Sequence, residues 1–182
     1  MRPAAYGLLG APLAMAALPL FVQLPAYYAT SLGMALAPLG GVLFGARLID
    51  MLQDPLLGHL LDRTAAPRRW MACGALALGL CFAALWLPPA AVAPAVWLAP
   101  LLVLAYGAHS LVNIAYLAWG ARLPQPSLAL SAVAWREAAG VAGMLAASLI
   151  PSAILAGDAA AIRPRLAGYC AGFALLLTLA LL

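Results

Sequence analysis

The chain has 182 residues, of which 67% are hydrophobic and only 8% are charged, and its formal net charge is +4. A soluble domain carries about 25% charged residues, so this composition cannot cover the surface of a water-soluble fold. It excludes a soluble enzyme, a nucleic-acid-binding module and a disordered tail. We therefore expect an all-α protein that crosses the membrane several times.

Long uncharged runs predict the number of helices. Residues 3–46 and 70–121 contain no formal charge, and because one span takes about 20 residues, each run holds more than one helix. Turn-forming residues at 30–33 and 88–94 divide the two runs. We expect one six-helix bundle over residues 1–182, with helices at 6–29, 35–61, 70–87, 95–119, 130–156 and 166–182.

The arginines predict the orientation, since cytoplasmic loops carry an excess of basic residues. The chain has no lysine, and beside abundant Ala, Leu, Pro and Arg this is typical of a GC-rich bacterial genome. We expect a multi-pass protein of the bacterial cytoplasmic (inner) membrane with a cytoplasmic N-terminus. This orientation places Arg2, Arg63, Arg68, Arg69 and Arg122 inside, and leaves Arg163 and Arg165, in an expected loop at 157–165, outside.

Polar residues at membrane depth single out the second, fourth and fifth helices, whereas the third and sixth carry almost none. The first helix adds Gln23 and Tyr27. This pattern indicates two triplets of helices whose last members are plain supports facing lipid. A 3+3 repeat of this kind builds one half of many secondary transporters.

The second helix carries the strongest signal. Arg47, Asp50 and Asp54 follow each other at spacings that place them on one helix face. Each charge exposed to lipid would cost about 2.5–3.5 kcal/mol, so this face is expected to look into a polar cavity or the bundle interior. One alternative is a structural Arg47–Asp50 pair that locks two helices, but the additional carboxylate of Asp54 favours a functional role.

A polar stripe on the fourth helix is suited to binding a hydroxylated or amide-bearing solute. It contains His109, Asn113 and Tyr116, which share a face because they lie three or four residues apart. Hydrogen bonding between helices is the alternative, and for His109 it is at least as plausible. On the fifth helix, Arg136 is either a site residue or a member of a structural pair.

The second helix and the loop after it carry a specific motif. It reads RLIDMLQDPLLG at 47–58 and is followed by Asp62-Arg63-Thr64 and Arg68-Arg69. This motif closely resembles the corresponding region of the glycoside–pentoside–hexuronide:cation symporters, the melibiose-permease-like branch of the major facilitator superfamily. Similarity at Asn113 and Arg136 supports the match, and weaker similarity at Tyr6-Gly7 and Tyr27-Tyr28 extends it over nearly the whole chain, as the N-terminal half of such a transporter.

The resemblance implies roles for individual residues. It implies a cation site at Asp50 and Asp54, with Gln53 at the position of a family asparagine. It also implies that Asn113 and Arg136 face the solute. The polar residues at membrane depth add the other candidates for the substrate cavity, which are Gln23, Tyr27, Arg47, His109 and Tyr116. The conformational loop motif would comprise Gly58, Asp62, Arg63, Arg68 and Arg69.

Three departures from the family pattern affect this reading. An acidic residue that some members carry on the first helix is replaced by alanine near Ala14, and an acidic residue on the fourth helix is replaced by Asn113. Proton coupling is therefore at least as plausible as sodium coupling. Family members have twelve helices, so we expect an N-terminal fragment that works with a missing C-terminal six-helix half or with a second copy.

The leading functional hypothesis is a secondary transporter of a small polar solute, such as a sugar or glycoside, coupled to H⁺ or Na⁺. The alternative is a structural or assembly membrane protein without transport activity. An enzyme is excluded because no GxSxG or HExxH motif is present. Apart from the coupling ion we expect no cofactor and no metal site, and the expected partners are the lipid bilayer and the solute, without nucleic acid.

Overall fold

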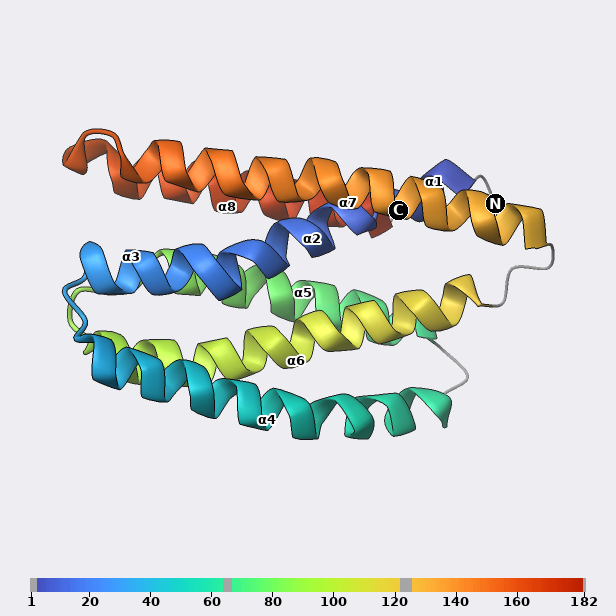
Figure 1. The fold of residues 1–182 in the computed structure, drawn as a ribbon, viewed down its shortest axis with the longest axis horizontal. Coiled ribbons are helices and arrows are strands. Elements are labelled where there is room, and N and C mark those ends of the chain that lie inside the picture. The colour runs from blue at the N-terminus through green and yellow to red at the C-terminus, as the bar shows by residue number, and fades with distance from the viewer. Residues whose placement is uncertain (1–2, 64–66, 122–125, 182) are drawn as a thin grey trace.

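The computed structural model describes residues 3–63, 67–121 and 126–181 (Figure 1). Within these ranges, six helical segments are long and apolar enough to cross a membrane. The expected all-α class with six spans is thus confirmed. The first span is divided into α1 (Pro3–Gly7), α2 (Gly10–Leu18), the π-helical segment η1 (Pro19–Gln23) and α3 (Leu24–Thr30), and the other five are α4 (Leu36–Asp62), α5 (Pro67–Trp86), α6 (Pro94–Gly120), α7 (Pro126–Leu155) and α8 (Ala159–Leu181).

Prolines explain why the first span is irregular. Pro12, Pro19 and Pro25 each lack the backbone N–H that an α-helix requires. At η1 the helical turn contains one extra residue, and the N–H of Leu24 donates to the backbone oxygen of Pro19. After α3 the chain turns at Gly33, whose φ of +67° favours glycine.

Two helices begin earlier than the sequence predicted. The fifth span begins at Pro126 instead of residue 130, because proline is well accepted at the first position of a helix. The sixth begins at Ala159 instead of residue 166, where the backbone N–H of Ala160 donates to Oδ1 of Asp158. Most of the expected loop at 157–165 is therefore helical, and Arg163 and Arg165 belong to the first turns of α8.

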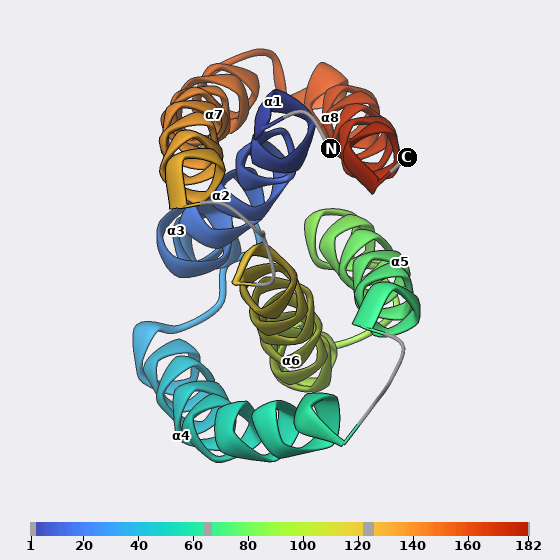
Figure 2. The ribbon, with the colours of Figure 1, turned by 90° about the vertical axis from the view of Figure 1, so that its right-hand side faces the viewer.

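The helix pairs follow the exchange expected of a 3+3 repeat. The first span packs on α7, the fifth, and α4, the second, packs on α6, the fourth. If the first three spans are exchanged with the last three, the first span takes the place of the fourth and the fifth that of the second. One of these pairs then becomes the other. The third and sixth spans, α5 and α8, pack on each other. The α4 and α7 helices lie at opposite sides of the bundle (Figure 2).

The α5 and α8 helices are more than supports facing lipid. They bury a cluster of aromatic rings in which Phe82 and Phe173 have centroids 4.2 Å apart and Trp86 meets Tyr169 edge-on. Since aromatic side chains bury large areas, this cluster makes the two helices part of the core. The polar residues consequently gather on the remaining helices.

Glycines allow the first span to approach α7 closely. A Cβ atom on Gly7 would lie 2.5 Å from Cβ of Trp135, and one on Gly10 would lie 2.5 Å from the backbone oxygen of Arg136. Small residues at such positions let membrane helices pack backbone against backbone. This close packing fixes where Arg136 emerges from α7.

Candidate functional site

A cavity of about 260 Å³ lies between α2, α6 and α7. It brings together His109, Asn113 and Arg136, three of the residues that the sequence predicted for the solute. Glu137 and the small residues Gly10, Ala14 and Gly140 complete much of its wall. The small side chains leave the space that the polar groups surround.

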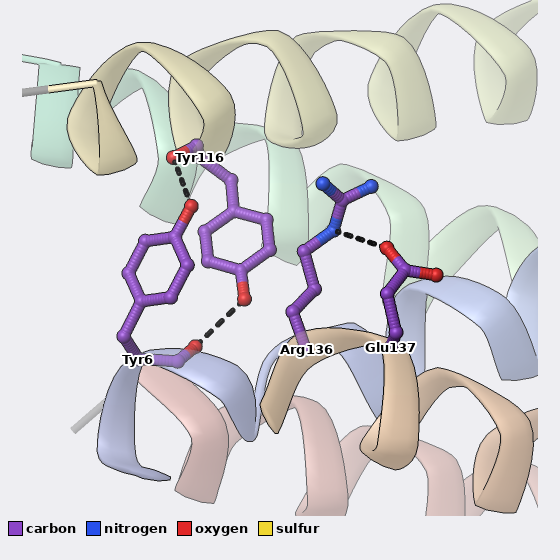
Figure 3. A network of polar contacts seen from close by, with 4 residues as sticks. All are labelled: Tyr6, Tyr116, Arg136 and Glu137. Atoms are coloured by element: carbon purple, nitrogen blue, oxygen red, sulfur yellow. Dashed lines mark hydrogen bonds and ion pairs between the residues drawn. The ribbon is translucent and has the colours of Figure 1, made fainter. Parts of the chain in front are cut away.

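Arg136 supplies the positive charge of this cavity. Its guanidinium lies over the ring of Tyr116, 5.8 Å from the centroid, and its Nε lies 3.9 Å from Oε1 of Glu137 (Figure 3). The side chain of Glu137 is 68% exposed and that of Arg136 28%, so this ion pair is weak. Arg136 therefore keeps most of its five N–H donors available for a ligand.

Tyr116 has a supporting position. Its hydroxyl donates to the backbone oxygen of Tyr6 at 2.7 Å, while the hydroxyl of Tyr6 donates to the backbone oxygen of Tyr116 at 3.2 Å (Figure 3). The two rings stack with centroids 4.4 Å apart. Since both hydroxyls are used, Tyr116 joins α1 to α6 and offers Arg136 the face of its ring.

His109 joins two helices and also lines the cavity. Its Nε2 lies 3.2 Å from the backbone oxygen of Leu13 on α2, which is the inter-helix hydrogen bond that the sequence left open. His109 therefore serves both as a contact between helices and as part of the cavity wall.

The charged face of α4 is built around an ion pair. Nη1 of Arg47 lies 2.7 Å from Oδ2 of Asp50, and the guanidinium lies 4.2 Å from the ring centroid of Phe21 and 5.3 Å from that of Tyr106. The pair lies within one helix, and the two rings connect it to η1 and α6. Sequence analysis missed Phe21, because nothing in its apolar surroundings distinguishes it.

Asp50 has one carboxylate oxygen without a partner. The residue is 8% exposed, and its Oδ1 is buried and accepts no hydrogen bond from the described residues. A buried carboxylate oxygen in this state is costly unless a proton, a cation or water satisfies it. Asp54, one turn further along α4, is exposed and takes part in no ion pair within the described ranges.

Gln53 lies apart from this group. It lines a different cavity, of about 540 Å³, between α4, α5 and α6, where Cys73 and Cys81 also lie. A Cβ atom on Gly107 would lie 2.6 Å from its Oε1, so the side chain packs against the backbone of α6. Sequence spacing alone did not reveal that Gln53 lies apart from the acidic residues. Although Gln53 is next to Asp54 in the chain, its side chain faces α5 and α6.

Two further candidates from the first span lie outside the cavity. Nε2 of Gln23 donates to the backbone oxygen of Ser148 at 2.9 Å and to Oγ of Ser152 at 3.3 Å, so Gln23 connects the first span to α7. Tyr27 is buried against the rings of Tyr28 and Trp86. Its ring belongs to the core.

The loop motif lies at one end of the bundle. Asp62 and Arg63 are exposed at the end of α4, and Arg68 and Arg69 are exposed at the start of α5. The guanidinium of Arg68 lies 5.3 Å from the ring centroid of Trp119. Gly58 is half-buried; Arg2, Arg122 and the linking residues 64–66 lie outside the described residues.

Six membrane spans, three of which line a small polar cavity that contains Arg136, define a polytopic membrane protein. The profile of one family, described as MFS/sugar transport protein, matches residues 3–182. The chain therefore belongs to this transporter family, whose members are not enzymes. The comparison with curated proteins found no match.

The pairing of Arg47 with Asp50 predicts a coupled effect on stability. Replacing Arg47 with Met leaves a buried carboxylate without its charged donor, so the free energy of unfolding should fall by about 1–3 kcal/mol. The double variant with Asp50→Leu should be destabilised by clearly less than the sum of the two single variants. Chemical unfolding in detergent, followed by circular dichroism, measures the cycle. Strict additivity would contradict the pairing.

Proposed function

We propose that this chain forms one half of a cation-coupled secondary transporter for a small polar solute. The observation that carries the proposal is that one bundle holds both a polar cavity and a buried carboxylate oxygen without a partner. The cavity contains the available guanidinium of Arg136, and on α4 the buried Oδ1 of Asp50 accepts no hydrogen bond from the described residues. Coupling requires a solute site and a cation site in the same bundle.

The cation, H⁺ or Na⁺, binds at Asp50 and Asp54 in this proposal. Oδ2 of Asp50 is used by Arg47, which leaves Oδ1 to receive a proton or coordinate Na⁺. Asp54 lies one turn along the same helix and supplies a second carboxylate. Gln53 does not enter the proposal, since it lines the other cavity.

The solute binds to Arg136, Asn113 and His109. Together these side chains offer several hydrogen-bond donors and an amide acceptor, a combination that suits a sugar or glycoside with many hydroxyl groups. The cavity of about 260 Å³ is smaller than the roughly 300–1,000 Å³ of typical ligand sites. A second six-helix unit, supplied by another segment or a second copy, would complete the site.

The distribution of arginines supports an N-terminus in the cytoplasm. Arg63, Arg68 and Arg69 lie at the end of the bundle where α4 meets α5, while Arg163 and Arg165 lie at the opposite end, where α8 begins (Figure 1). The excess of positive charge at the first end is typical of the cytoplasmic side. The bacterial inner membrane is the proposed location.

Replacing Asp54 with Asn tests the cation site. The thermal stability of the purified chain should rise in NaCl relative to choline chloride if the ion is Na⁺, or on acidification if it is H⁺. A cation at a hundred times its dissociation constant stabilises by about 2.7 kcal/mol, and Asp54→Asn should lose this gain. Asp62→Asn, which removes a carboxylate from the loop motif, should keep it.

The same experiment separates the proposal from its alternative. In a structural or assembly protein, the charged pair and the His109 bond would serve packing alone, and both are present. Asp54→Asn would then leave any effect of NaCl or pH unchanged. That result, or a wild-type chain indifferent to both conditions, would contradict the cation site.

Arg136→Gln tests the solute site. Equilibrium dialysis of the purified chain against a panel of radiolabelled hexoses, disaccharides and hexuronates measures the affinity of the solutes that bind. Losing a charged hydrogen-bond donor costs about 1.5–3 kcal/mol, so the affinity should fall about 10- to 100-fold. Arg165→Gln, at the other end of the bundle, is the control and should bind normally. Equal affinity in the two variants would overturn the role of Arg136.

A further inference from the structure

A separate cavity lies at the end of the bundle that carries the loop motif. It has a volume of about 310 Å³ and lies between α1, α5, α6 and α8. Its lining is mostly apolar, and among the described residues Arg68 is the one charged side chain that lines it. Among the residues that line it are Tyr6, Leu9, Arg68, Met71, Trp119 and Leu181.

Arg68 makes one edge of this cavity positive. Its guanidinium lies 5.3 Å from the ring centroid of Trp119, a cation–π contact that orients the group beside the cavity. Arg63 and Arg69 are exposed in the same part of the chain. In the described part of the chain, none of these three arginines forms an ion pair. Asp62 is the one acidic residue of this segment, so the positive charge dominates.

Hydrogen bonds and close packing hold the wall of the cavity in place. The reciprocal hydrogen bonds between Tyr6 and Tyr116 hold the ring of Tyr6 in place. A Cβ atom on Gly120 would contact the hydroxyl of Tyr6, so the wall fits tightly against α6. A preformed site binds with a smaller entropic cost.

We propose that this cavity binds an anionic phospholipid, with its phosphate on Arg68 and one acyl chain along Leu9, Met71 and Leu181. The guanidinium fork matches phosphate oxygens, and basic pockets between membrane helices recognise anionic headgroups. The apolar lining accounts for the chain, which free phosphate lacks. Trp119 suits the depth, because tryptophan is enriched at membrane–water interfaces. Within the described ranges, this cavity shares no lining residue with the one that contains Arg136.

Native mass spectrometry of the purified chain in detergent tests this site. The chain is titrated with phosphatidylglycerol and with phosphatidylcholine carrying the same acyl chains. The anionic lipid should bind about fivefold more tightly, the gain expected from one nearby arginine, and Arg68→Gln should abolish the difference. Arg69→Gln is the matched control, since it removes the same charge from an exposed neighbour that does not line the cavity.

A second variant tests the acyl chain without changing charge. Ala72 is exposed and lines the cavity, so Ala72→Leu should fill part of it and weaken both lipids. Equal binding of the two lipids to the wild-type chain would overturn the proposal. Equal losses in Arg68→Gln and Arg69→Gln would overturn it too, as they would show attraction to surface charge alone. Displacement of phosphatidylglycerol by equimolar inorganic phosphate would also contradict a lipid site.

Discussion

A carboxylate at membrane depth must be paired, hydrated or bound to a ligand, and this requirement determines how α4 is arranged. Arg47 satisfies one oxygen of Asp50 and lies over the rings of Phe21 and Tyr106. The charge on α4 thereby holds this helix to η1 and α6. The other oxygen is buried and accepts no hydrogen bond from the described residues, so the same pair that stabilises the fold leaves the oxygen at which we propose that a cation binds. The structural and functional interpretations of Arg47 and Asp50 are therefore compatible.

The opposite side of the bundle depends on close packing. Gly7 and Gly10 bring the first span against α7, and the mutual hydrogen bonds of Tyr6 and Tyr116 join that span to α6. Arg136 projects from this rigid frame with only a weak pair to Glu137. A well-fixed donor with unused capacity is what a solute site needs.

The sequence predicted the fold well because hydrophobic runs and turn residues are local signals. The six spans followed from them, and the spacing of polar residues indicated the polar faces of α4 and α6. The family followed from the motif at residues 47–58 and the loop after it. The structure brings His109, Asn113 and Arg136 together in one cavity, and their role in solute binding stays a prediction. These signals depend on residue type and period, which a single sequence displays.

Features that depend on neighbouring helices were not predictable. The direction of Gln53 and the use of the Tyr116 hydroxyl depend on which helix lies opposite. The contact between the Arg47 guanidinium and the Phe21 ring joins residues far apart in the chain, and no pattern in a single sequence predicts it.

Infrared difference spectroscopy of the reconstituted chain tests most directly whether Asp50 is a cation site. Exchanging choline for Na⁺, or changing pH in the absence of Na⁺, should alter a carboxyl or carboxylate band. The account predicts that this change disappears in Asp50→Asn and persists in Asp62→Asn. A band that survives in Asp50→Asn, or a wild-type spectrum that responds to neither ion, would contradict it.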